Sequence, residues 1–394
     1  MIRAGAGQSS NPSTERAAEQ AAVEAMNQAG VSRADAVVVF FTVDHAPNNQ
    51  MLLSTLTRVT RCDQIVGSSG AGILTGAGEI EGRPGVAVLV FASDKVQGRP
   101  FLFQLLREHD EEVGAKIAQA AGADRGSLLA LFPDTYNGQP HQLLHGIEEK
   151  IGFVPVVGAG STESGMAQAT YQICGETCRS NAVAGLQLSG SFEAIVDITQ
   201  GCQPITDPMV ITKADGNLIL EIDDRPALEV FAKLLKGPLA QDLRRALMFI
   251  FVGLPAGPDQ DAIVAGQYLV RNIIGLDPAK GILGIAEQVR EGQSMIFTLR
   301  DGQRAREDLT QMLQRQSQKL DGKNPAFGLY FNCCARGSSL YGMPGIDTAY
   351  IRQALGDFPL LGMFGGYELA PLGTKNHLFA YTGVLTLITE ANPN

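Results

Sequence analysis

The sequence predicts an α/β protein with mixed β-sheets and helices, built from repeated strand-helix-strand-strand units. Short apolar runs of strand length alternate with helix-length amphipathic segments, which is the pattern of such folds. One block recurs at a constant offset, since Ala36 and Ser127 are 91 residues apart, and so are Gly67 and Gly158. The chain also has 45 glycines, which suits many tight turns and close backbone approaches.

The elements of the first repeat follow a helix expected over residues 13–29. Pro12 and Ser13 favour its start and Gly30 its end, while the first ten residues form a small, polar beginning. The repeat itself is expected as a buried strand, a helix, a second strand, a glycine-rich loop and a further strand. These cover residues 36–42, 48–60, the run up to Gly67, 67–72 and 85–93.

The second and third repeats have the same order of elements. PVVG at 155–158 and PLLG at 359–362 resemble each other closely, which supports the third repeat. The second repeat is expected over 127–133, 139–150, 154–157, 158–165 and 182–188. The third is expected over 327–333, 347–355, 359–366 and 377–388.

Further elements are expected between the second and third repeats. Helices are predicted over 226–236 and 307–320, and strands over 244–254, 268–274 and 295–299. We therefore divide the chain into an N-terminal segment and helix (1–30), a first domain (31–224) and a second domain (225–394).

Composition excludes several classes of protein. The 394 residues include 31 Lys and Arg against 41 Asp and Glu, a net charge of −10, which argues against wrapping nucleic acid or binding an anionic membrane. No stretch approaches the roughly 20 apolar residues of a membrane span, and no signal peptide begins the chain. The 6 cysteines are too few for a disulfide framework, so we expect a cytoplasmic protein in a reducing compartment.

Several motifs in the middle and late parts of the chain are ordered as in a known family. They are GCQPIT (201–206), VIT (210–212), GN (216–217), EID (221–223), PAL (226–228), NCCARG (332–337) and PLLGMFGGYE (359–368). Together with the early GSSGAG (67–72), this order resembles the FIST family, the sensory domains of F-box and intracellular signal-transduction proteins. The resemblance extends over about residues 30 to 385, with the family's N- and C-terminal halves on the two domains.

The resemblance implies a sensory module for a small ligand in signal transduction. The chain has no room for an output domain, so a stand-alone protein would signal through an output protein on a separate chain. Some members of the family resemble haem-binding nitric oxide sensors, so haem is kept as an alternative cofactor. Two departures, Ala335 and Tyr367 where the family usually has Gly, put transfer of a family ligand in doubt.

The late repeat contains the residues expected to bind the ligand. Cys333 and Arg336 follow a predicted strand, and Glu368 follows the next strand of the same repeat, near Gly365 and Gly366. An Arg and a Glu at one sheet edge would hold the carboxylate and the amine of an amino acid or a similar polar metabolite. The alternative is a structural Arg–Glu ion pair that joins two loops.

The glycine-rich loops are the second candidate for ligand binding. Ser68 and Ser69 lie in the first of them, where free backbone N–H groups would face a small polar ligand. Neither loop has the Lys of a phosphate-binding loop, and tight turns between strands are the structural alternative.

Cysteines and histidines give weaker signals. Cys174 and Cys178 lack a second pair of metal ligands nearby. His141 and His145 are four residues apart on a predicted helix but lack the Glu of a zinc protease motif. We therefore expect no metal site. We expect a binding protein without catalytic activity. A thiol enzyme with Cys333 as nucleophile, a haem-based redox sensor, and a structural or self-assembling protein stay open, and a homo-oligomer is compatible with all of them.

Overall fold

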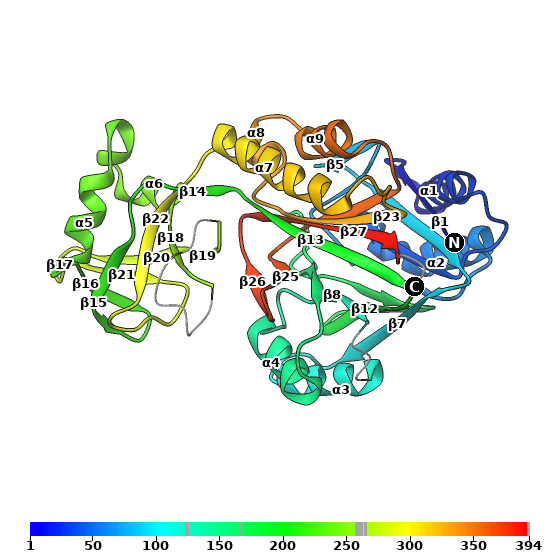
Figure 1. Cartoon of the computed structure of the whole chain (residues 1–394), viewed down its shortest axis with the longest axis horizontal. Helices are drawn as coiled ribbons and strands as arrows, with labels where there is room; N and C mark the ends of the chain where they lie inside the picture. Colours follow the sequence, from blue (N-terminus) through cyan, green and yellow to red (C-terminus); the bar gives the residue numbers. More distant parts are fainter. Residues whose placement is uncertain (123–125, 166, 257–262, 264–265, 392–394) are drawn as a thin grey trace. The chain divides into compact units, whose positions relative to one another are not determined.

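The chain divides into two compact units. The computed structural model describes residues 1–122, 126–165, 167–256, 263 and 266–391. Unit 1 comprises residues 1–199, 308–378 and 382–394, and unit 2 comprises residues 200–307 and 379–381 (Figure 1). These compact units do not meet at the expected boundary between residues 224 and 225, because residues 308–378 pack with the first half of the chain.

Unit 1 consists of three repeats, each longer than the sequence predicts. Each repeat is an edge strand, a helix, a strand, a second helix, a parallel strand, a hairpin and a final strand. The first has β1 (Ile2–Ser9), α1 (Thr14–Ala29), β2 (Ala36–Phe41), η1 (Val43–Asn48), α2 (Asn49–Thr60), β3 (Ile65–Ser69), β4 (Gly72–Thr75), β5 (Gly78–Glu81) and β6 (Val86–Ser93). The second has β7 (Val96–Gln104), α3 (Asp110–Ala121), β8 (Leu128–Pro133), α4 (Pro140–Ile151), β9 (Val156–Ala159), β10 (Gln172–Cys174), β11 (Thr177–Arg179) and β12 (Ala182–Gly190).

The third repeat is interrupted by unit 2, which lies in the chain between its edge strand and its first helix. Its elements are β13 (Phe192–Gln200), α7 (Gly302–Leu320), β23 (Phe327–Cys333), α8 (Ser338–Tyr341), α9 (Ile346–Leu355), β24 (Leu360–Gly365), β25 (Glu368–Leu372), β26 (Lys375–Phe379) and β27 (Thr382–Glu390). The predicted repeat lacks the edge strands β1, β7 and β13, and it also lacks helix α3 and the hairpins β4–β5 and β10–β11.

Each repeat contributes a hairpin to the sheet of another repeat. The three sheets have the strand orders β1-β6-β2-β3-β10-β11, β26-β25-β9-β8-β12-β7 and β13-β27-β23-β24-β4-β5. Within each sheet the two central strands are parallel, and the others described are antiparallel to their neighbours. The sheets are therefore mixed, as predicted, and this exchange of hairpins links the three repeats through shared sheets.

Three equivalent glycines allow the parallel strands to approach each other. A Cβ atom on Gly67, Gly158 or Gly362 would lie 1.7, 2.0 or 1.9 Å from the carbonyl oxygen of the residue paired with it. A side chain at these positions would collide with backbone. The predicted loop at 67–72 is wrong, since Gly67 to Ser69 belong to β3 and Gly72 begins β4.

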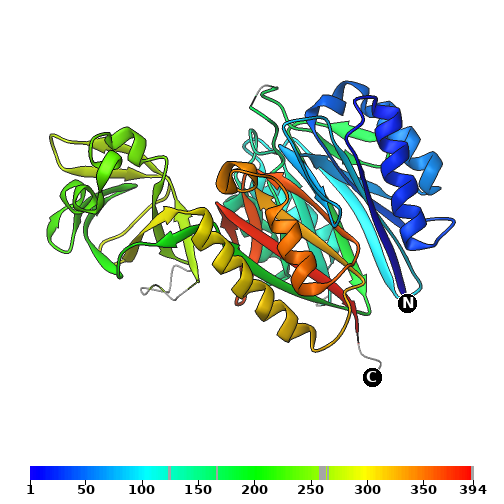
Figure 2. The same ribbon diagram turned by 90° about the horizontal axis from the view of Figure 1, so that it is seen from above.

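Two helices cover the outer face of each sheet. α1 and α2 pack on the first sheet, α3 and α4 on the second, and α7 and α9 on the third, each over its own apolar cluster (Figure 1). α1 lies alongside β1, where a Cβ atom on Gly5 would be 2.0 Å from Ala25 O (Figure 2). Small residues on both elements make this contact possible.

The inner faces of the three sheets meet at three equivalent phenylalanines. The ring centroids of Phe40 and Phe132 are 5.0 Å apart, those of Phe132 and Phe331 are 5.9 Å apart, and those of Phe40 and Phe331 are 6.1 Å apart. Each ring comes from the middle strand of a different repeat. The phenylalanines thus mark the axis of unit 1.

Unit 2 is a sheet of short strands, antiparallel in every described pair, with a separate apolar cluster. Residues 244–249 are not strand as predicted, because a short helix precedes the strand, and the predicted strand over 268–274 divides into two. The elements are β14 (Cys202–Pro204), β15 (Met209–Asp215), β16 (Leu218–Ile222), β17 (Arg225–Pro226), α5 (Ala227–Leu234), η2 (Gly237–Ala240), α6 (Leu243–Ala246), β18 (Ile250–Pro255), β19 (Tyr268–Arg271), β20 (Ile273–Asp277), β21 (Ile282–Ile285) and β22 (Ser294–Arg300). Among the described residues of either unit, no helix is both long and apolar enough to cross a membrane.

Candidate functional site

The parallel strands of the three repeats end together at one side of unit 1. Three equivalent backbone hydrogen bonds link the repeats there: Ala71 N–H donates to Phe364 O (3.0 Å), Thr162 N–H to Ser69 O (3.2 Å), and Gly366 N–H to Gly160 O (3.0 Å). Ligands of open α/β sheets commonly bind at the carboxyl ends of the strands. This ring of bonds therefore marks the region of unit 1 where a site is expected.

Four polar side chains, which we call the axial layer, face the interior beside the three phenylalanines. They are Ser68, Gln172, Cys333 and Glu368. Successive residues of a strand point to opposite faces, and Ile173 and Leu369 pack under the outer helices, so Gln172 and Glu368 point inward. Cys333 is two residues beyond Phe331 on β23 and shares its inward face.

The axial layer brings residues of all three repeats together. Ser68 lies directly opposite Gln172 in the register of β3 and β10, and its hydroxyl donates to Met363 Sδ at 3.4 Å. Glu368 pairs with Ala159 of β9 and interacts electrostatically with Cys333. None of the four side chains is more than 4% exposed, so the layer is closed to solvent.

Glu368 is a buried carboxyl with only half of its hydrogen-bonding capacity used. Its Oε2 accepts from the hydroxyl of Thr382 at 2.7 Å and from the backbone N–H of Thr382 at 3.3 Å. Its Oε1 has no hydrogen-bond partner, and neither does Oε1 of Gln172. Burial, and then the proximity of Cys333, raise the pKa of Glu368 well above its usual value, against the effect of the Thr382 hydrogen bonds. Burial therefore favours the protonated, neutral form of this carboxyl.

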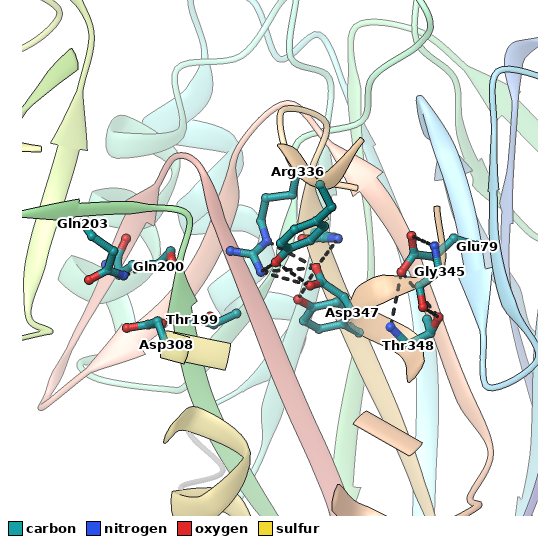
Figure 3. Close-up of polar contacts among 12 residues, drawn as sticks. Glu79, Thr199, Gln200, Gln203, Asp308, Arg336, Gly345, Asp347 and Thr348 are labelled. Carbon is teal, nitrogen blue, oxygen red and sulfur yellow. Dashed lines mark hydrogen bonds and ion pairs between the residues drawn. The ribbon is translucent and has the colours of Figure 1, made fainter. Parts of the chain in front are cut away.

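Arg336 was expected to pair with Glu368, but the structure gives it a different acid. Its Nη2 lies 3.2 Å from Asp347 Oδ1, and both side chains are fully buried (Figure 3). The reason is the direction of the side chains: Asp347 lies on α9, which covers the outer face of the third sheet, whereas Glu368 points inward. Burial, the largest single effect, lowers the pKa of Arg336, but the charge of Asp347, the two tyrosines Tyr341 and Tyr330 and the hydrogen bond to Asp347 together raise it well above its usual value.

Asp347 collects donors from four side chains. Besides Arg336 these are the hydroxyls of Tyr330 (3.0 Å) and Tyr341 (2.8 Å) and the amide of Asn332 (2.8 Å). Burial raises the pKa of both tyrosines, which stay protonated as donors. This group fixes the loop after β23 to α9 and has the character of a structural anchor.

Two carboxylates of β5 hold the start of the late helices. Glu79 accepts hydrogen bonds from the backbone N–H groups of Gly345 (2.7 Å) and Thr348 (3.2 Å) at the start of α9 (Figure 3). Glu81 accepts from the backbone N–H and the hydroxyl of Ser338. Burial, followed by the charge of Asp347, raises the pKa of Glu79 to about 7. The hairpin of the first repeat is thus tied to the third.

The remaining predicted site residues have backbone or structural contacts. The Ser69 hydroxyl donates to Thr162 O at 3.1 Å and accepts from the backbone N–H of Tyr171 at 3.1 Å. Gly365 pairs with Cys333, and a Cβ atom on it would lie 2.5 Å from Ala159 Cβ. Gly366 belongs to the ring of backbone bonds. These residues shape the strand ends around the axial layer.

Analysis of the sequence missed Gln172, Asp347 and Glu79. Gln172 pairs with Ser68 just as Glu368 pairs with Ala159, at equivalent places in two repeats, but this equivalence is visible only in the strand pairing and not in the sequence. Asp347 was visible as the first acidic residue of a predicted helix, which is a typical capping position. Nothing in the sequence pointed to Glu79, since its partners come from another repeat.

The pair Cys174 and Cys178, the pair His141 and His145, and the buried His45 lie on different elements of unit 1. Cys174 and Cys178 lie on the β10–β11 hairpin, where burial raises the pKa of both thiols. His45 is buried, with Nδ1 3.1 Å from Thr14 Oγ1, and burial lowers its pKa. His141 and His145 are exposed on α4.

Comparison with solved structures finds a likeness to the crystal structure of a cyanuric acid hydrolase from A. caulinodans. The TM-score is 0.29 at 10% identity, with 48% of this chain and 70% of that chain covered. A score this low does not support an argument about fold or function.

Comparison of sequences finds relatives over nearly the whole chain. An uncharacterized protein of Mycobacterium tuberculosis is 27% identical over 392 residues, covering 99% of this chain and 100% of the relative. An uncharacterized protein of Mycobacterium bovis is 28% identical over 393 residues, with 99% of each chain covered. The FIST N domain model matches residues 35–225 and the FIST C domain model matches residues 227–371. The chain therefore belongs to the FIST family, whose domains are associated with sensory roles in signal transduction.

Proposed function

We propose that this protein is a non-enzymatic sensor that binds a small polar ligand with amine or amide N–H groups, such as an amino acid, at the axial layer. The observation behind the proposal is the pair of buried acceptor oxygens without partners, Glu368 Oε1 and Gln172 Oε1. An unsatisfied buried polar group costs about 1–3 kcal/mol. A ligand that donates to these oxygens would recover that cost.

The chemistry of Glu368 suits an amine. Burial raises the pKa of Glu368 and so favours its protonated form in the unliganded protein. A ligand ammonium would favour the ionised form and make a charge-assisted hydrogen bond in a site of low dielectric constant. Binding of an amine would then favour release of a proton from Glu368.

The closed surroundings of the layer suit a sensor. Ser68, Gln172 and Glu368 are fully buried, and the strand ends around them are joined by the backbone ring. A ligand enters only when part of this ring opens. Occupancy would therefore be coupled to the contacts between repeats, which is the coupling that a sensory domain needs.

The test is a thermal-denaturation screen of the full chain against the twenty amino acids and simple amines, followed by calorimetric titration of each hit. A ligand at 100 times its Kd stabilises the folded state by about 2.7 kcal/mol. We expect Glu368→Gln to weaken binding at least tenfold and to abolish the proton release, which titrations in buffers of different ionisation enthalpy measure.

The matched control is Glu287→Gln in unit 2. Glu287 accepts from buried Arg271 at 2.9 Å, so this substitution also neutralises a partly buried carboxylate. Its affinity for the ligand should equal that of the wild type. If no compound stabilises the wild type, or if Glu368→Gln binds as tightly as Glu287→Gln, the assignment of the site is wrong.

A further inference from the structure

The helices α3 and α4 of the second repeat cross at two glycines. A Cβ atom on Gly114 would lie 2.3 Å from Leu143 O, and one on Gly146 would lie 2.1 Å from Glu111 O. The two backbones therefore approach more closely than side chains would allow. Figure 1 shows α3 and α4 side by side, and so close a crossing brings residues beside the two glycines near each other across the helices.

Three potential metal ligands lie beside this crossing. Glu111 precedes Gly114 by one turn on α3, and His145 and Glu149 are on either side of Gly146 on α4. One ligand atom of each lies within 4.8 Å of the others. His145 and Glu149 are four residues apart and share a face of the helix. From the sequence we expected no metal site at the pair His141 and His145. In the structure His145 lies instead with Glu111 and Glu149.

The surface here is a depression of about 470 Å³ with an excess of negative charge. Asp110, at the first position of α3, lines it and is only 1% exposed. Its Oδ1 accepts from the backbone N–H of Gln139, but its Oδ2 has no hydrogen-bond partner. A buried carboxylate oxygen without a donor is stabilised by a nearby cation. The acidic residues of the lining are Glu108, Asp110, Glu111, Glu112 and Glu149.

We propose that Glu111, His145 and Glu149 bind one divalent transition-metal ion of the Zn²⁺ class between α3 and α4. One imidazole and two carboxylates are a ligand set that Zn²⁺ accepts, and three protein ligands leave a fourth position for water. Bonds of about 2.0–2.2 Å in a tetrahedral site require ligand atoms roughly 3.3 Å apart. All three side chains are exposed and can rotate to close the remaining distance. The ion would join the two helices, with Asp110 adding negative charge from below.

The experiment is a calorimetric titration of the full chain with ZnCl₂, repeated with CoCl₂ while the visible absorption of Co²⁺ is recorded. We expect one saturable site with a Kd below about 10 µM and a Tm that rises with bound Zn²⁺. His145→Asn, Glu111→Gln and Glu149→Gln should each raise the Kd at least tenfold and change the Co²⁺ spectrum. These side chains are exposed, so the variants should fold.

His141→Asn is the control, because His141 lies one turn earlier on the same helix and is also exposed. Its Zn²⁺ affinity should equal that of the wild type. Cys334→Ser tests the exposed thiol as a competing ligand. The proposal is overturned if the variants of the three proposed ligands bind Zn²⁺ like the wild type, or if the wild type does not bind one Zn²⁺ ion per chain. Loss of the site in His141→Asn or Cys334→Ser would also overturn it. Amino-acid binding at the axial layer is measured separately in the presence of a chelator, so either proposal can fail alone.

Discussion

Asp347 and Glu368 are two carboxyl groups of unit 1 that are equally buried but differently satisfied. Both side chains are 0% exposed. Asp347, on the outer face of its sheet, accepts hydrogen bonds from Tyr330, Tyr341, Asn332 and Arg336 on its two oxygens. Glu368, on an inner face, has donors from Thr382 for one oxygen and none for the other.

The difference separates a structural group from a candidate binding group. A buried charge whose hydrogen bonds are complete makes a rigid anchor. When it is removed, its partners stay buried without a hydrogen-bond or charge partner, which costs folding free energy. A buried carboxyl with a free oxygen costs stability in the absence of a ligand. Analysis by residue type alone would rank the two acids equally, and only their surroundings distinguish them.

The largest effect should come from Asp347→Asn. The substitution leaves the guanidinium of Arg336 buried without a counter-ion, and breaking a buried pair in this way costs about 3–5 kcal/mol. Denaturant unfolding of the wild type and the variant measures the difference. A loss smaller than about 1 kcal/mol would show that Asp347 is not the anchor that its contacts describe.

Glu79 should produce the next largest effect, through pH. Its pKa is about 7 in the folded protein and near 4.5 when unfolded, so the folded state binds more protons between these values. The free energy of unfolding should therefore be highest below about pH 4.5 for this group and fall as pH rises to about 7, by at most about 3 kcal/mol. Glu79→Gln should flatten this part of the pH profile, and a variant with the wild-type slope would contradict the assignment.

The repeat was visible in the sequence because its middle strands are long apolar runs, as in residues 36–41 and 327–333. The edge strand β1 was not visible in the sequence, since Gly5 and Gly7 interrupt the apolar alternation typical of a strand. These glycines instead allow α1 to pack closely against β1. The interruption by unit 2 also left no local pattern, because it depends on which distant strands pair. Strand β13 and helix α7 belong to one repeat although about 100 residues separate them.

The candidate site was predicted in part. Cys333 and Glu368 lie near each other because Cys333 ends β23 and Glu368 follows β24 in the same repeat, at adjoining strand ends. Their role in ligand binding stays a prediction. The partner of Arg336 was predicted wrongly, since sequence does not show on which face of a sheet a loop residue turns. Gln172 required knowledge that the hairpin of one repeat joins the sheet of another, which no local pattern encodes.

A smaller effect of opposite sign is expected from Glu368→Gln. Without ligand, the neutral amide keeps an acceptor for Thr382 and removes a carboxyl whose ionisation is disfavoured by burial, so the variant should gain about 1 kcal/mol or more above neutral pH. Because the pKa of Glu368 is raised in the folded state, the contribution of Glu368 to the free energy of unfolding of the wild type is lost as pH rises through this raised pKa. The stability of Glu368→Gln relative to the wild type should therefore grow with pH. Unfolding at pH 6 and pH 9 tests this against Asp347→Asn. A loss of several kcal/mol at both pH values would place Glu368 with the structural anchors.

The smallest effects should separate two neighbouring serines. The Ser69 hydroxyl both donates to Thr162 O and accepts from the backbone N–H of Tyr171, so Ser69→Ala should cost about 1 kcal/mol and leave ligand affinity unchanged. The Ser68 hydroxyl contacts only a thioether sulfur among the bonds described for it, and Ser68→Ala should cost less than about 0.5 kcal/mol. Because Ser68 faces Gln172 in the axial layer, its substitution should instead weaken ligand binding. Equal unfolding free energies and equal affinities for the two variants would remove the distinction between the ring of backbone bonds and the axial layer.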